Sequence, residues 1–169
     1  LLSFEEIVRV ATLFAQLAAN AKAERMVDPA SWYQHYGVVL QSMGWSVSSF
    51  ALQRRSFRRL DVDLANEALD IIEAAIGGVT LKVLETALSS MREVVVDGGG
   101  LLTLFEGSAS QDTVANFQLG QVTAEEDGSL TMPMGIFYFR SFEEKKNFLF
   151  VSWSSDRVTL TADAQVLSL

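Results

Sequence analysis

The hydrophobic pattern of the chain changes its period at Gly98-Gly99-Gly100, and this change constrains the fold most strongly. Before the glycines, apolar residues recur every three or four positions, as in amphipathic helices; after them the pattern alternates, as in strands. Helices and strands segregated along a chain in this way are typical of an α+β fold. We therefore expect a mainly helical part over 1–97 and an antiparallel β part over 98–169, packed as one cooperative domain.

Capping signals mark the first two of about four expected helices. Ser3 and Glu6 have capping-box spacing, so the first helix should begin there and run to about residue 20. Asp28-Pro29 and Gly44 are start and stop signals for a second helix over 29–43. The first helix is apolar around most of its surface, which predicts that it is buried in a core; the alternative is contact with a partner or lipid.

Two more helices and one strand complete the first part. Trp45 to Gln53 alternates in polarity and should form a strand that joins the later sheet. Asp61 or Asp63 should cap a third helix that ends at Gly77-Gly78. A fourth helix over about 80–92 then forms a helical hairpin with the third.

The β part should be a meander, because its connections are too short for parallel crossovers. Residues 136–139 and 148–153 are apolar on both faces, which indicates central strands covered on both sides. We expect the helices to cover one face at most, leaving the other for a sheet, a second protomer or a ligand. The five expected strands are Leu101 to Phe105, Val114 to Thr123, Leu130 to Phe142, Asn147 to Ser154 and Val158 to Leu167.

Catalytic and metal-binding motifs are missing from the sequence. The chain has no cysteine and one histidine, His35, which excludes thiol nucleophiles, iron–sulfur clusters and His-rich zinc sites. Asp61-Val62-Asp63 lacks the later ligands of a calcium loop, and the triple glycine lacks the rest of a phosphate loop. We therefore expect no metal, no cofactor and no enzymatic activity, and an acid–base hydrolase is the least favoured alternative.

The net charge of −8 argues against nucleic acid as a partner, because phosphate binding requires a basic surface. No apolar run reaches the roughly 20 residues that span a bilayer as a helix. The absence of cysteine suits a reducing compartment but leaves the cellular location open, either cytoplasmic or secreted without disulfides.

An aromatic cluster in the second helix is the candidate ligand-binding face, formed by Trp32, Tyr33, His35 and Tyr36. Spacings of three and four place Trp32, His35 and Tyr36 on one side of the helix, where they could stack on a sugar or hold a cation. The interpretation we favour is structural: an aromatic seam packed between helix and sheet.

An arginine-rich segment is the candidate binding site for a partner or lipid, formed by Arg54, Arg55, Phe57, Arg58 and Arg59. Guanidinium groups bind carboxylates and phosphates bidentately, and Phe57 would be an apolar anchor. The simpler interpretation is ion pairing within the chain, with Asp61, Asp63, Glu67 and Asp70.

Our leading hypothesis from the sequence is a non-enzymatic interaction protein, possessing toxin- or virulence-like features. It would engage a protein partner, a second copy or an anionic membrane surface through apolar β surface and the arginine-rich segment. The alternative is a small-ligand or carbohydrate-binding module that uses the aromatic face of the second helix.

Overall fold

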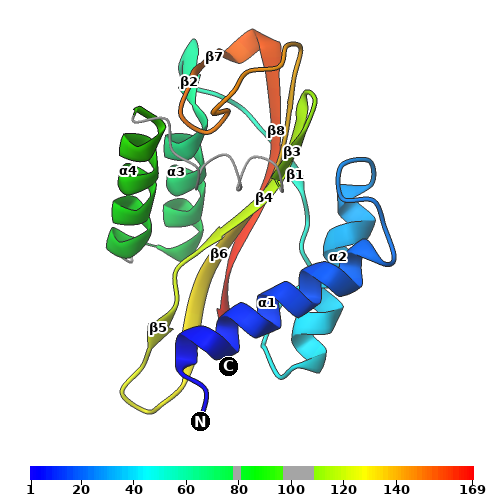
Figure 1. The fold of residues 1–169 in the computed structure, drawn as a ribbon, viewed down its shortest axis with the longest axis vertical. Coiled ribbons are helices and arrows are strands. Elements are labelled where there is room, and N and C mark those ends of the chain that lie inside the picture. The colour runs from blue at the N-terminus through cyan, green and yellow to red at the C-terminus, as the bar shows by residue number, and fades with distance from the viewer. Residues whose placement is uncertain (78–80, 97–108) are drawn as a thin grey trace.

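The computed structural model describes residues 1–77, 81–96 and 109–169, and within them it confirms the α+β fold (Figure 1). The helices are α1 (Phe4–Asn20), α2 (Pro29–Ser42), α3 (Leu64–Ile76) and α4 (Lys82–Val96). The strands are β1 (Gln53–Arg55), β2 (Asp61–Asp63), β3 (Ser110–Gln111), β4 (Val114–Gly120), β5 (Thr123–Ala124), β6 (Leu130–Ser141), β7 (Ser152–Ser154) and β8 (Val158–Ser168).

The main sheet is antiparallel and has the strand order β1-β8-β6-β4-β3, with β5 paired to β6. Strands β4, β6 and β8, which correspond to three of the five expected strands, form an antiparallel meander in which Phe137 of β6 lies between Phe117 of β4 and Ala162 of β8. A separate two-stranded ribbon joins β2 to β7. Because β1 precedes α3 in the chain and pairs with β8, the helical and β parts share one sheet.

Local capping explains why the helices begin and end where they do. Ser3 and Glu6 form the capping box of α1, and the side chain of Asp28 accepts from the backbone N–H of Ser31 at the start of α2. Asp63 caps α3, and Gly77 ends it with a left-handed backbone, φ +69°. That conformation favours glycine. These boundaries were predicted from the sequence.

The helices cover both faces of the sheet, which corrects the expectation that they would cover one (Figure 1). Phe137 and Phe139 point into a core shared with α3 and α4. Met134 and Ile136, on the opposite face of the same strand, point into a second core beneath α1 and α2. The two apolar faces of β6 are therefore both buried by this chain's own helices.

Three expected strands differ from the structure or lie outside it. The segment 45–53 holds a single bridge, Ser46 to Ser168, before β1 begins at Gln53. Residues 147–151 turn instead of extending, because Asn147 has φ +59° and its carbonyl accepts from the N–H groups of Phe150 and Val151. The expected strand over 101–105 lies outside the described residues.

Candidate functional site

Helix α1 carries its small residues inside and its large apolar residues outside. Ala11, Ala15 and Ala19 are buried in the core shared with α2 and the sheet, together with Val8. The alanines let the helix backbone lie close to its neighbours, so only a narrow stripe of α1 is covered. The expectation that this broadly apolar helix is buried is therefore wrong for its outer side.

The α1 outer face is formed by Val10, Leu13, Phe14 and Leu17, which are 55%, 53%, 56% and 58% exposed. Their spacing of three and four residues places them on one side of the helix, the pattern with which a helix docks into an apolar groove. Phe4, 50% exposed, lies at the N-terminal end of the same helix. Soluble proteins rarely leave a continuous apolar patch of this kind without an interaction that covers it.

Charged residues lie beside the α1 outer face and at its two ends. Glu5 and Glu6 occupy the first turn and Arg9 the second, and all three are exposed. Lys22 and Glu24 follow the C-terminal end and are also exposed. An apolar centre with a charged rim is the usual composition of a protein–protein interface.

Three of the residues named as a candidate ligand-binding face, Trp32, Tyr33 and Tyr36, belong to the core. Trp32, Tyr33 and Tyr36 are at most 1% exposed, and the rings of Trp32 and Tyr36 are stacked at 5.3 Å. Burial raises the pKa of both tyrosines above the usual range. His35 is half-buried at the same helix. In this arrangement the stacking surfaces of Trp32 and Tyr36 are occupied by protein.

A buried polar network beneath this aromatic cluster was missed by the sequence reasoning. Asn116 of β4 is fully buried, accepts from the Tyr33 hydroxyl and donates from Nδ2 to the carbonyl of Arg25 at 2.8 Å. The Arg25 guanidinium lies over the Trp32 ring at 4.9 Å, and burial lowers its pKa. The sequence signal that could have indicated this network is a single asparagine, Asn116, within an expected strand.

The arginine-rich segment includes the edge strand β1 and the loop that follows it. Arg55 donates from Nη2 to the carbonyl of Ala162 at 3.1 Å, whereas Arg54, Arg58 and Arg59 are exposed. Phe57 packs against the α3 side of the core and is only half-buried. Arg55 and Phe57 are therefore held partly by contacts within the fold, whereas the other three arginines remain exposed.

A groove of about 570 Å³ lies between this segment and α3. Arg58 and Arg59 line it on one side, and Glu67 and Asp70 on the other. Burial, followed by the nearby Asp70, raises the pKa of Glu67, and the two arginines oppose that shift. Within the described part of the chain, the ion pairs are Arg92–Asp63 at 2.8 Å and Lys145–Glu143 at 3.5 Å, so the arginines of the groove are not closely paired.

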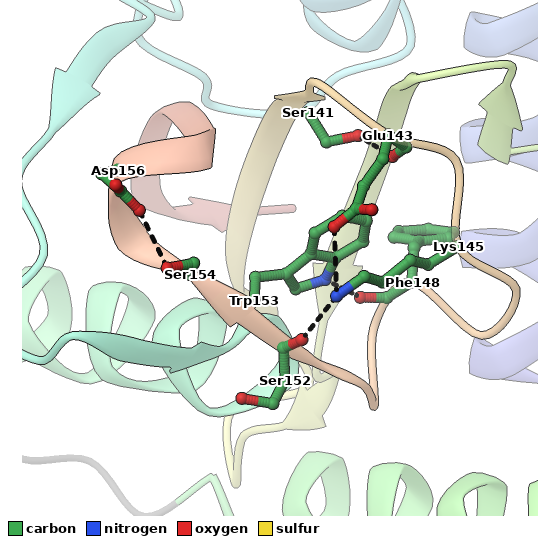
Figure 2. Close-up of polar contacts among 8 residues, drawn as sticks. All are labelled: Ser141, Glu143, Lys145, Phe148, Ser152, Trp153, Ser154 and Asp156. Atoms are coloured by element: carbon green, nitrogen blue, oxygen red, sulfur yellow. Dashed lines mark hydrogen bonds and ion pairs between the residues drawn. The ribbon is translucent and has the colours of Figure 1, made fainter.

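A smaller pocket of about 270 Å³ has an aromatic floor of Phe139, Phe148 and Trp153. Lys145 also lines the pocket, and its Nζ lies 4.8 Å from the centre of the Trp153 ring. The same Nζ donates to the carbonyl of Ser152 at 3.1 Å (Figure 2). Glu143 pairs with the same ammonium (Figure 2). The charge of Lys145 is therefore already satisfied by the protein.

The rim of this aromatic pocket carries charges of both signs, Asp112 and Glu144 against Lys146. Such a rim selects neither an anion nor a cation by itself. The apolar floor is the part that would favour a ligand, because pockets bind small molecules mainly through apolar and aromatic surface.

Among the described residues, no helix is both long and apolar enough to cross a bilayer, and no cluster of three or more metal-ligating side chains occurs. No protein-family model matches the chain, and neither a curated protein nor a solved structure matches it.

Proposed function

We propose that this chain is a non-enzymatic interaction protein that docks a protein partner through the α1 outer face. The observation that carries the proposal is the inverted arrangement of α1, with alanines inside and four large apolar side chains outside. A helix selected only for packing would bury its large side chains. The function class is the one expected from the sequence, a non-enzymatic interaction protein, but the proposed binding surface lies on α1 and not on the sheet.

The exposed side chains could supply useful binding free energy. Full burial of a Val, Leu or Phe side chain contributes about 1.5–3 kcal/mol, so covering each half-exposed one contributes about 0.8–1.5 kcal/mol. Four of them give about 3–6 kcal/mol, and matching apolar surface on a partner could double this. Association itself costs about 4–15 kcal/mol, so the expected complex is reversible.

A protein partner fits this surface better than a membrane does. The net charge of −8 disfavours approach to an anionic bilayer, and Glu5 and Glu6 lie in the first turn of the exposed helix. Arg58 and Arg59 would have to overcome that repulsion. We expect no association with anionic vesicles at low ionic strength, where charge attraction would be strongest.

Photo-crosslinking from the helix tests the proposal. A benzophenone amino acid would replace Leu17 on the α1 outer face or, as a control, Val83 on α4, which is 68% exposed, and the adducts would be identified by intact mass. We expect protein adducts from position 17, in the purified protein or after addition of cell extract, and few from position 83. Absence of any protein adduct from position 17 in both settings would refute the proposal.

A second candidate function, binding of a small apolar ligand, is favoured by the aromatic pocket. Its volume of about 270 Å³ equals roughly nine water molecules at 30 Å³ each, enough for one aromatic ring with a short substituent. A fragment screen by ligand-observed NMR, with Phe148→Ala and the distant Val83→Ala as a control, would test it. Binding that survives Phe148→Ala would exclude this pocket.

A further inference from the structure

We infer that the groove between α2 and the segment 48–50 binds a neutral sugar ring. This site is separate from the α1 outer face, because among the described residues that line the groove none belongs to α1. Four observations support the inference: the polar side chains of the groove, its aromatic wall, the rigidity of the segment that forms one side, and its size.

One face of α2 forms the first wall of the groove. Gln34, Gly37 and Gln41 follow one another at spacings of three and four residues, so they lie on the same side of the helix. A β-carbon at Gly37 would lie 3.5 Å from Cδ2 of Phe50, so the glycine lets the Phe50 ring lie close to the helix backbone. The two glutamines therefore lie one on each side of a position at which the helix carries no side chain.

The polar side chains of the groove are amides and hydroxyls. Gln34 and Gln41 line it from α2, Ser48 and Ser49 line it from the facing segment, and all four are exposed. An amide group and a hydroxyl group each both donate and accept hydrogen bonds, and so do the hydroxyl groups of a sugar. Among the described residues that line the groove, none is charged at neutral pH, so the groove does not select an ion. A neutral ligand with several hydroxyl groups matches these side chains.

Phe50 supplies an apolar wall on which the C–H groups of a sugar ring can pack. It is half-buried and lines the groove. Its ring centre lies 5.9 Å from that of Tyr33 and 6.1 Å from that of Tyr36, and these contacts hold the ring in place. Tyr33, one of the residues expected from the sequence to bind a ligand, lines the groove as well.

The segment 48–50 is fixed by side chains of β8 and α2. Gln165 of β8 accepts from the backbone N–H of Ser48 at 2.8 Å and donates from Nε2 to the carbonyl of Ser48 at 3.0 Å. On the other side, Gln41 donates from Nε2 to the carbonyl of Val47 at 2.7 Å. A site held in place before the ligand arrives loses less conformational entropy on binding.

The groove has the size of a site for one ring. Its volume is about 330 Å³. Sites for small molecules span roughly 300–1,000 Å³, so this groove lies at the small end of the range. A single ring with its outer hydroxyl groups left in water should bind weakly, with a dissociation constant on the order of 1–10 mM.

Saturation-transfer difference NMR on the full chain tests the inference. The probes are the methyl glycosides of glucose, galactose, mannose and N-acetylglucosamine. We expect at least one of them to bind in the millimolar range and to resist displacement by an equal concentration of cyclohexanol, a ring with a single hydroxyl group. Absence of transfer from all four glycosides, or equally effective displacement by cyclohexanol, would overturn the inference.

Three substitutions locate the binding. Gln34→Ala and Ser49→Ala change exposed side chains, and each should weaken the best glycoside by roughly two- to tenfold, because each removes a hydrogen bond. Phe50→Leu keeps an apolar side chain but removes the aromatic face, and should weaken binding by a similar factor. The matched control is Gln111→Ala, which removes an exposed glutamine on β3 and should leave the dissociation constant unchanged.

The inference and the proposed function can fail separately. Glycoside binding that is unchanged by all three substitutions, in chains shown by circular dichroism to be folded, would overturn this groove as the site. The crosslinking result at position 17 concerns the α1 outer face alone, so either result leaves the sugar site to be decided by the glycosides.

Discussion

Replacing Gly135 by alanine tests the contact between α3 and the sheet, on which the separation of the two cores depends. Gly135 lies in the middle of β6, between Leu119 of β4 and Ala164 of β8. A β-carbon at this position would lie 2.5 Å from Cζ of Phe137 and 2.7 Å from Cγ1 of Ile72 on α3. Both distances are shorter than carbon atoms tolerate without displacement.

The expected loss of stability follows from these contacts. Phe137 and Ile72 are fully buried, so neither side chain can swing away, and overpacking should cost about 3 kcal/mol, the upper end of its usual range. Restricting the unfolded chain offsets about 0.5–1 kcal/mol of this. The net loss should be about 2 kcal/mol, or a melting temperature roughly 4–8 °C lower for a chain of this size.

Urea unfolding followed by circular dichroism measures the effect. The unfolding midpoint should fall with an unchanged slope, because the surface exposed on unfolding stays the same. Gly37→Ala in α2 is the matched control: its β-carbon would meet Phe50 at an ordinary 3.5 Å, so this change should stabilise by about 0.5–1 kcal/mol. A Gly135→Ala chain within about 0.5 kcal/mol of wild type would refute the packing of α3 against β6.

Three further predictions concern buried or partly buried polar groups. Asn116→Ala should destabilise by about 2 kcal/mol in urea unfolding, because the Tyr33 hydroxyl and the Arg25 carbonyl lose their partner; a neutral result would exclude the network. Burial raises the pKa of Tyr36, so the folded chain keeps the phenolic proton up to a higher pH than the unfolded chain does. The stability that this group contributes is present below about pH 10 and is lost as the pH rises further. Tyr36→Phe should reduce this alkaline loss, measured as the free energy of unfolding against pH, and an unchanged slope would contradict it. Burial raises the pKa of Glu67, so above the pKa that this carboxyl has in the unfolded chain its ionisation destabilises the folded chain. Glu67→Gln should therefore raise stability at neutral pH by up to about 0.5 kcal/mol. A loss of stability instead would indicate a close pair with Arg58 or Arg59.

Much of the fold could be predicted from short stretches of sequence. The capping box of Ser3 and Glu6, the Asp28-Pro29 start of α2 and the glycine that ends α3 act through hydrogen bonds and dihedral preferences of neighbouring residues. The alternation at the start of β8 reflects the two faces of a strand. Such signals depend on neighbouring residues alone, so they can be recognised without the tertiary structure.

Segments whose conformation depends on distant contacts were predicted less well. Residues 148–151 are as apolar as a central strand, yet they turn after Asn147 and bury Phe148 and Leu149 under the sheet. Trp32 and Tyr36 have the spacing of a ligand-binding face, but the same spacing also suits a seam between α2 and the sheet. Local pattern does not distinguish such alternatives, because burial depends on what packs against the residues.

The sequence alone determined the order and type of most elements, including α1 and its apolar surface. Only the tertiary structure decided which part of that surface is covered, because this depends on how the two helix pairs divide between the faces of the sheet. With α3 and α4 on one face and α1 and α2 on the other, both sides of β6 are closed. The apolar surface left exposed is on α1, because its alanines, and not Val10, Leu13, Phe14 and Leu17, fit the space beside the sheet.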